Sequence, residues 1–257
     1  MSETLTNNEY KMISSLSNKK FRDINNLYVI EGEHLIEEYL KSDLPDLGIK
    51  YIIARNDYQN YDLGDKLSGF NLHLLNRAKF DKLCDTKTPQ GVLAVVEKKI
   101  IYANEGNKFI VALENINDPG NLGTILRTCY WFGVDKVLIS ENSADIYNPK
   151  TIRSTQGAIF HLSIETDVNL NSKLESLSKS GFEIFLTSLD GKPVGNGLKT
   201  DKCVLVFGNE ANGISNVIQD NENYRQIKIE SYTDCESLNV AVSAGILISE
   251  FRKTLIK

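Results

Sequence analysis

Cysteine and histidine are scarce in this sequence, with four and three residues respectively among 257. The four cysteines are scattered, and no two of them stand at the spacing of a metal site or a redox motif. We therefore expect free thiols, no disulfide and no metal site. The nearest approach to a zinc motif, His34-Leu35-Ile36-Glu37-Glu38, lacks the second histidine and is typical of an amphipathic helix.

Long apolar segments are also absent, and the chain opens on polar and acidic residues. We therefore expect no membrane helix and no secretory signal, and we place the protein in the cytoplasm. The formal net charge of −5 argues against a surface that is basic all over, but it leaves room for a local basic patch. The glycine fingerprint G-x-G-x-x-G is missing too, which disfavours an ordinary nucleotide-binding enzyme.

The apolar runs predict an α/β protein of two domains. In the first hundred residues, short strands at 27–30, 49–54 and 91–96 alternate with helical segments, one of them at 10–16. The polar stretch 102–107 contains glycine and is typical of a linker. We predict a small α/β domain over residues 1–104 and a second domain over residues 105–257.

The second domain carries five apolar runs separated by helical segments. They lie at 109–113, 137–139, 182–186, 203–207 and 227–229. Most are continuous rather than alternating, as in strands that are buried on both faces of a parallel sheet. We therefore predict a parallel sheet for this domain.

Three short motifs stand at the ends of these elements. The first follows the run at 109–113, the second follows the run at 203–207, and the third precedes the last helix. They read Asn117-Asp118-Pro119-Gly120-Asn121-Leu122-Gly123 running on to Arg127-Thr128, then Phe207-Gly208-Asn209-Glu210-Ala211-Asn212-Gly213, and then Glu236-Ser237-Leu238-Asn239-Val240.

Each motif alone also has a purely structural explanation. Asn121 is a suitable N-cap for the helix that follows the first turn, and Arg127 lies off the apolar stripe of that helix. Glu210 can cap the helix after the second motif, and Ser237 and Asn239 are common capping residues. The small residues of the last helix fit core packing or a subunit interface.

Together, in this order and at this spacing, the motifs resemble those of the SpoU (TrmH) family of RNA ribose 2′-O-methyltransferases, in the SPOUT superfamily. The resemblance covers residues 109–257. It implies a parallel-sheet domain with a deep trefoil knot, S-adenosylmethionine bound in that knot, and a homodimer with active sites near its interface. Carried over by motif, the catalytic residues are Asn121, Arg127, Glu210, Ser237 and Asn239, and the cofactor-binding residues are Gly208, Ile229 and Leu238.

The N-terminal domain resembles, more loosely, the substrate-binding domain that precedes many members of this family. The matching features are the basic cluster Lys19-Lys20-Phe21-Arg22, then Val29-Ile30-Glu31-Gly32, and later Thr88-Pro89-Gln90-Gly91-Val92. The cluster predicts RNA contacts by Lys19, Lys20 and Arg22, although three charges around one aromatic are also typical of a solvated face. The sequence departs from the family beside the cofactor pocket, where Glu230-Ser231 replaces a common Pro-Met and Thr233 a common glycine.

The resemblance implies methylation of a ribose 2′-hydroxyl in structured RNA, and the two-domain layout favours ribosomal RNA over tRNA. Since a guanidinium is protonated at neutral pH, we expect Arg127 to hold the target phosphate and to stabilise developing oxyanion charge. A tRNA ribose methyltransferase is the first alternative. The second alternative is a noncatalytic RNA-binding or ribosome-assembly protein that retains the fold. A measurement of cofactor binding distinguishes this alternative from the enzyme.

Overall fold

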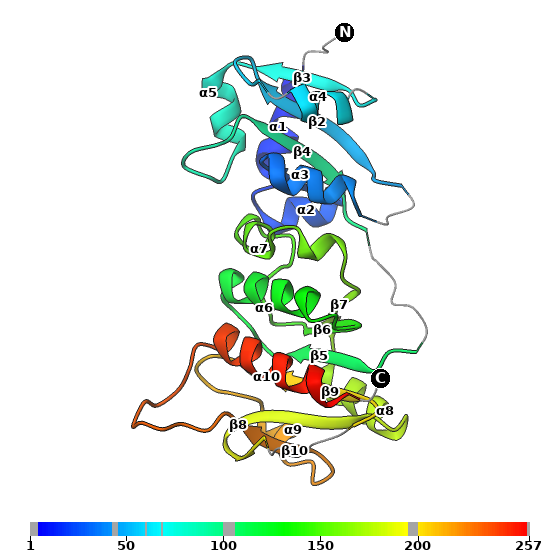
Figure 1. The fold of residues 1–257 in the computed structure, drawn as a ribbon. Coiled ribbons are helices and arrows are strands. Elements are labelled where there is room, and N and C mark those ends of the chain that lie inside the picture. Colours follow the sequence, from blue (N-terminus) through cyan, green and yellow to red (C-terminus); the bar gives the residue numbers. More distant parts are fainter. Residues whose placement is uncertain are drawn as a thin grey trace. The chain divides into compact units, whose positions relative to one another are not determined.

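The computed structural model describes residues 5–42, 46–59, 61–67, 69–99, 106–194 and 200–255 (Figure 1). The chain forms two compact units. We call Met1–Lys99 together with Tyr147–Phe160 the N-terminal unit, and Ile100–Ile146 together with His161–Lys257 the sheet unit. Most of the linker predicted at 102–107 lies outside the described residues.

The N-terminal unit contains a mixed sheet of four strands in the order β1-β4-β2-β3. These are β1 (Leu27–Glu31), β2 (Ile49–Arg55), β3 (Leu72–Leu75) and β4 (Val92–Glu97). Strand β4 runs antiparallel to β1 and β2, whereas β2 and β3 are parallel. The three predicted strands of this unit are confirmed. Strand β3 escaped prediction because it buries His73 and Leu75 while it exposes Leu72 and Leu74, so its polarity does not follow its burial.

Short helices surround this sheet. They are α1 (Asn7–Ser15), α2 (Lys19–Asn25), α3 (Glu33–Leu40), α4 (Tyr61–Lys66), α5 (Arg77–Phe80) and the 3₁₀ turn η1 (Asp81–Leu83). Helix α1 confirms the helix predicted at 10–16. Its buried Ile13 packs with Leu27, Ile53 and Phe80 in the core of the unit.

One segment from the second half of the sequence, Tyr147–Phe160, also belongs to the N-terminal unit. It contains α7 (Pro149–Thr155) and the 3₁₀ turn η2 (Ala158–Phe160). Arg153 Nη1 pairs with Asp85 Oδ2 at 2.7 Å, and the ring of Phe160 meets Tyr39 edge-on at 5.0 Å. Gly157 has a φ of +91°, and a Cβ there would lie 2.6 Å from Glu38 Cβ, so glycine permits this close approach.

The sheet unit contains six strands in the order β10-β8-β9-β5-β6-β7, and every neighbouring pair is parallel. The strands are β5 (Phe109–Leu113), β6 (Lys136–Ser140), β7 (Ile164–Val168), β8 (Glu183–Pro193), β9 (Cys203–Phe207) and β10 (Arg225–Lys228). The five predicted strands and the parallel sheet are confirmed. Strand β7 was not predicted because this edge strand exposes most of its polar residues and has no continuous apolar run.

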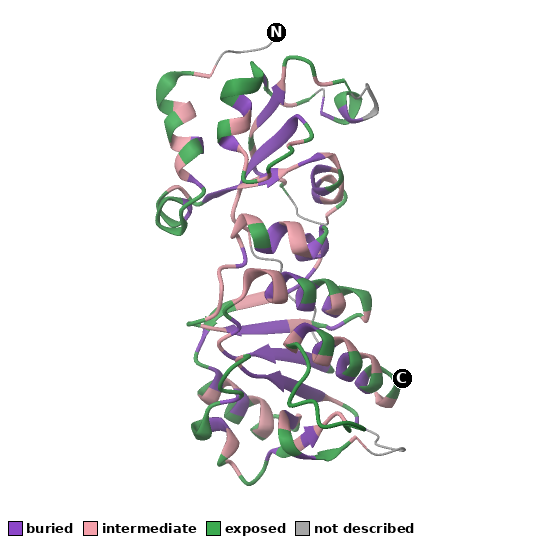
Figure 2. Cartoon of the chain, turned by 90° about the vertical axis from the view of Figure 1, so that its left-hand side faces the viewer, coloured by how far each residue is buried: buried purple, intermediate pink, exposed green. Residues whose placement is uncertain are grey.

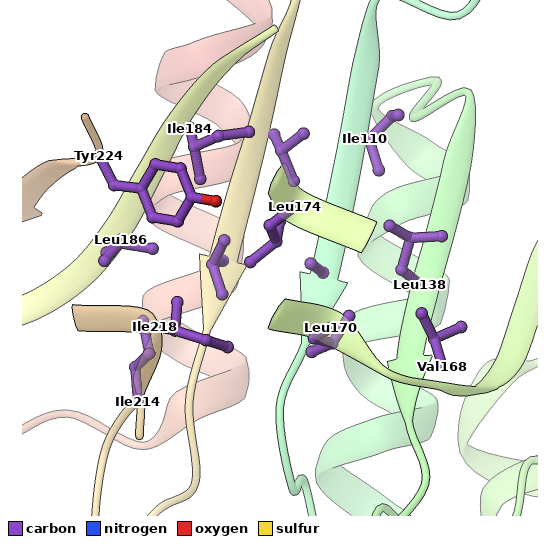
Figure 3. Packing of buried hydrophobic residues seen from close by; sticks show 13 residues of the cluster. Ile110, Leu138, Val168, Leu170, Leu174, Ile184, Leu186, Ile214, Ile218 and Tyr224 are labelled. Carbon is purple, nitrogen blue, oxygen red and sulfur yellow. The ribbon is translucent and has the colours of Figure 1, made fainter. Parts of the chain in front are cut away.

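Both faces of this sheet are covered, which explains the continuous apolar runs (Figure 2). In β5, Ile110 and Ala112 pack in a cluster with residues of α8 (Leu170–Lys179) and α9 (Asn216–Gln219), such as Leu174 and Ile218 (Figure 3). Helix α10 (Val240–Thr254) packs along α6 (Pro119–Trp131) and buries Phe251 against Phe185 of β8. The trefoil knot implied by the family resemblance stays a prediction.

Candidate active site

The three motifs follow β5 and β9 or link β10 to α10, in a sheet whose strands all run parallel. The carboxyl ends of parallel strands share one edge of the sheet, and ligands of open α/β sheets bind at that edge. The first motif opens α6, the second forms the loop from Gly208 to Gly213, and the third contains Asn239, the N-cap of α10. This edge is therefore the candidate active site.

The sequence suggested Asn121 as the N-cap of α6, but its side chain does not cap the helix. The N-cap is Asp118, whose Oδ1 accepts a hydrogen bond of 2.8 Å from the backbone N–H of Asn121, and Pro119 follows in the first turn. Aspartate caps well because its carboxylate accepts from the free N–H groups and suits the positive end of the helix dipole. The amide of Asn121 is thereby left available for other contacts.

A chain of hydrogen bonds joins the three motifs through that amide. Asn239 Nδ2 donates to Asn121 Oδ1 at 3.0 Å, and Asn121 Nδ2 donates to Glu210 Oε1 at 3.0 Å. One residue from each motif thus meets at the sheet edge. We call Asn121, Glu210 and Asn239 the polar triad.

Helix capping fixes the direction of this chain. Asn239 Oδ1 accepts from the N–H groups of Ala241 and Val242, so only its NH₂ group remains to face Asn121. Asn121 must then present its oxygen to Asn239 and its NH₂ group to the carboxylate of Glu210. Asn121 therefore binds Oε1 of Glu210, and the other oxygen of this carboxylate, Oε2, takes no part in the triad.

The loop that carries Glu210 is closed by tight backbone contacts. Asn209 and Gly213 exchange N–H···O bonds of 3.0 and 2.9 Å, and Asn209 Oδ1 accepts from the N–H of Ala211. A Cβ at Gly208 would lie 2.3 Å from the backbone of Gly213, so only glycine fits. The loop therefore holds Glu210 on a constrained backbone, and Glu210 does not cap α9, whose N-cap is Ser215.

Arg127 and Ser237 lie near the triad in sequence but are not bonded to it. Arg127 is exposed on α6, whose buried stripe includes Leu122, Leu126 and Cys129, as the sequence predicted. Within the described residues, no carboxylate pairs with the Arg127 guanidinium and no hydrogen bond engages the Ser237 hydroxyl. Both groups are therefore open to a ligand.

The surroundings of the triad suit an apolar and polar cofactor such as S-adenosylmethionine. The backbone at Gly213 faces open space, and the side chain of Leu238 is 48% exposed beside Asn239. Ile229 is half-buried just after β10. An exposed leucine beside the polar triad offers one apolar face and several hydrogen-bonding groups, which is the composition of small-ligand sites.

The basic cluster divides into two exposed lysines and one buried arginine. Lys19 and Lys20 are exposed on α2, as RNA contacts require. Arg22 is only 2% exposed, and its Nη1 donates to the carbonyls of Leu16 and Ser17, each at 2.8 Å. The RNA-binding prediction for Arg22 is therefore wrong, because its guanidinium holds the turn between α1 and α2.

Sequence comparison places the chain in a family. Residues 108–249 match the model of the SpoU rRNA methylase family. The chain belongs to this family. Residues 7–94 match the MRM3-like substrate binding domain, so both halves of the predicted resemblance are confirmed.

Two curated relatives and one solved structure match almost the whole length of the chain. It is 33% identical to the 23S rRNA (guanosine(2553)-2′-O)-methyltransferase RlmP of Bacillus subtilis, over 97% of this chain and 98% of that protein. It is 25% identical to the mitochondrial rRNA methyltransferase 3 of Xenopus tropicalis, over 95% and 74%. The AdoMet-bound rRNA methyltransferase of Sinorhizobium meliloti superposes with a TM-score of 0.82 at 27% identity, over 100% of this chain and 99% of that one.

Proposed function

We propose that this protein transfers the methyl group of S-adenosylmethionine to a ribose 2′-hydroxyl of ribosomal RNA. The observation that carries the proposal is the polar triad, in which one residue from each motif meets at the ligand-binding edge of a parallel sheet. The names of RlmP and of rRNA methyltransferase 3 support ribosomal RNA over tRNA.

Bound S-adenosylmethionine supplies an activated methyl group on its sulfonium, and the residues of the chain place the nucleophile and its proton. Gly208, Ile229 and Leu238 hold the cofactor, largely through backbone groups. Ser237, whose hydroxyl is open to a ligand, contributes that hydroxyl to the same cofactor and substrate site. No metal is required by this scheme.

Arg127 binds the target phosphate and stabilises negative charge as the ribose oxygen attacks. A guanidinium has five N–H donors and no acceptor, so it suits a phosphate and does not serve as a base at neutral pH. Its exposed position on α6 and its lack of a carboxylate partner among the described residues leave these donors available. Arg127 is therefore an electrostatic residue in this proposal.

Glu210 accepts the proton of the 2′-hydroxyl in the same proposal. An ionised carboxylate is acceptor-only, and Asn121 already holds Oε1 at 3.0 Å, which aims the other oxygen. The ribose 2′-hydroxyl would lose its proton to this carboxylate as its oxygen attacks, and bound S-adenosylmethionine would supply the methyl group. Asn239 keeps Asn121 in the donating orientation.

The N-terminal unit binds the RNA through a surface that includes Lys19 and Lys20. Both lysines are exposed in the first turn of α2, whose N-cap is Asn18. Lysine ammonium groups contact phosphates without reading sequence, so this contact supplies affinity and not nucleotide choice.

The active form is a homodimer built on the free face of α10. Leu238, Val242 and Ile246 recur at intervals of one helical turn and are 48%, 50% and 40% exposed. Helix α6 packs beside α10 and carries Trp131, which is 83% exposed. An apolar stripe of this kind on the two helices with Asn121 and Asn239 of the triad at their N-terminal ends favours a second copy of the chain as its partner.

The test combines cofactor binding with methyl transfer to ribosomal RNA lacking the modification. Calorimetry should detect S-adenosylmethionine binding to the full chain, and mapping of ribose methylation should identify one modified nucleotide. A folded protein without cofactor binding would indicate the noncatalytic RNA-binding alternative. Methylation of tRNA alone would replace the substrate class.

Arg127 variants test the catalytic assignment. Arg127→Ala should retain folding and cofactor binding but lose most methyl transfer, and Arg127→Lys should restore little because one ammonium cannot replace a planar fork. Arg225→Ala is the matched control, since Arg225 is an exposed arginine at the start of β10, at the opposite edge of the sheet. Near-normal turnover of Arg127→Ala on the true RNA would show that Arg127 is not catalytic.

A further inference from the structure

A buried glutamate outside the motif residues assigned to catalysis, Glu114, is hydrogen-bonded to the residues on both sides of the Glu210 loop, Phe207 and Ser215. Glu114 follows the last residue of β5, is 8% exposed, and extends the sheet ladder by donating its N–H to the carbonyl of Phe207 at 2.8 Å. A buried carboxylate is costly unless hydrogen bonds satisfy it.

Both oxygens of Glu114 bind the same residue, 101 positions away. Oε2 accepts from the backbone N–H of Ser215 at 2.8 Å, and Oε1 accepts from the Ser215 hydroxyl at 2.6 Å. Ser215 is the N-cap of α9, yet its side chain makes no capping bond there. A serine at this position usually accepts from the helix N–H groups, so the hydroxyl has been turned toward Glu114 instead.

The neighbouring residue, Asn115, holds the other end of the same loop. Asn115 has a φ of +54°, and its carbonyl accepts a hydrogen bond of 2.8 Å from Asn209 Nδ2. Asn209 precedes Glu210, and Ser215 stands five residues after it. Two consecutive residues at the end of β5 thus fasten the loop on both sides of Glu210.

The same strand end also sets the position of Asn121, the partner of Glu210. Asn121 lies seven positions after Glu114. Between them, the N–H groups of Asn115 and Ile116 donate to the hydroxyls of Ser140 and Ser143 at 2.8 and 3.2 Å. The segment is therefore fixed between the Glu210 loop and α6. A shift of the loop relative to this segment would break the 3.0 Å bond between Asn121 and Glu210.

We propose that Glu114 is a positioning residue for methyl transfer, which acts by fixing the Glu210 loop through Ser215. The proposal rests on the role of Glu210 in the proposed function. Glu114 touches neither substrate nor cofactor in this scheme. It sets the place of the carboxylate that accepts the 2′-hydroxyl proton, and geometric errors of about 1 Å are costly for such a group.

The experiment is a double-mutant cycle in the full chain with Glu114→Gln, Glu210→Gln and the double variant. Glutamine keeps the volume of Glu114 but removes its charge, and its NH₂ group can be accommodated only if the Ser215 hydroxyl turns to accept, so both charge-assisted bonds to Ser215 are lost. We expect Glu114→Gln to lower kcat by about tenfold or more, the scale of one lost charge-assisted hydrogen bond, with little change in KM for RNA. In the Glu210→Gln background the same change should have almost no further effect.

Two additional variants supply an independent test of the Glu114–Ser215 contact and a control. Ser215→Ala removes the hydroxyl while leaving the glutamate intact, so it should lower kcat in the same direction and be equally silent beside Glu210→Gln, even if Glu114→Gln folds poorly. Glu165→Gln is the matched control, because Glu165 lies on edge strand β7 and its carboxylate pairs with Lys136 of β6 and Lys173 of α8. It should leave kcat unchanged.

The outcomes separate this inference from the proposed function. If Glu210→Gln loses activity and the losses from Glu114→Gln and Glu210→Gln multiply, Glu114 does not act through Glu210 and the inference is overturned while the function stands. If Glu210→Gln turns over like the unmodified protein, the proton-acceptor role fails and this inference fails with it. Coupled losses with an unaffected control support both.

Discussion

Replacing Arg22 distinguishes an RNA contact from a structural arginine. Its guanidinium donates two hydrogen bonds of 2.8 Å, to the carbonyls of Leu16 and Ser17, in a buried turn between α1 and α2. A hydrogen bond to a charged group contributes about 1.5–3 kcal/mol, so Arg22→Met should destabilise the N-terminal unit by about 3 kcal/mol. Arg22→Ala also removes the buried stem and should cost roughly 2 kcal/mol more.

Hydrogen exchange with mass spectrometry resolves this effect by region. Peptides from α1, α2 and β1 should exchange about a hundredfold faster in Arg22→Met, because 1.4 kcal/mol corresponds to a factor of about ten in an opening equilibrium. Peptides from β5 and β9 of the sheet unit should change much less. Lys20→Ala is the control, since an exposed lysine away from such contacts changes stability by about 0.5 kcal/mol at most.

RNA binding supplies the second half of the test. Arg22→Met should retain the RNA affinity of the unmodified protein at a temperature where the variant is folded. Lys19→Ala combined with Lys20→Ala should weaken binding and reduce its salt dependence, because two phosphate contacts are lost. If Arg22→Met keeps full exchange protection but loses RNA affinity, the structural role assigned to the buried guanidinium is refuted.

Three further predictions concern the sheet unit. Gly208→Ala should weaken S-adenosylmethionine binding by about tenfold or more in calorimetry, because the new Cβ would lie 2.3 Å from loop backbone; Gly245→Ala, whose Cβ meets nothing within 4 Å, should not. Iodoacetamide at mildly alkaline pH should alkylate exposed Cys235 first, and bound cofactor should slow this alkylation. Cys84 should stay unreactive, because burial raises the pKa of its thiol to about 12. Ile246→Lys should yield monomers in analytical ultracentrifugation, and a dimer unchanged by this charge would place the interface elsewhere.

The fold of the sheet unit was largely readable because its strands are buried on both faces. The run at 203–207 is apolar at every position, and all five residues are buried in β9. Edge strand β7 carries no such signal, since only one of its five residues is buried. Complete burial therefore makes the central strands easy to predict, whereas β7 was missed. Edge strand β10, with one buried residue of four, was still found because Ile227 and Ile229 flank Lys228.

The candidate site was predicted as a set of residues and not as a geometry. The motifs named Asn121, Glu210 and Asn239, but the bonds that join them span 89 and 118 positions in sequence. Local patterns also suggested the wrong N-cap for α6. Asp118 and not Asn121 caps α6, because both residue types suit an N-cap and the turn geometry decides between them.

By itself, the sequence determined the family, the parallel sheet, and the residue types available for cofactor, proton and phosphate, since these depend on local order and spacing. Only the tertiary structure decided which polar groups meet. It buried Arg22 beneath a turn, joined the motifs through the Asn121 amide, and bonded Glu114 to the residues on both sides of the Glu210 loop. The physical reason is that hydrogen bonds are short and directional, so residues far apart in sequence pair only when the packed sheet brings them within about 3 Å.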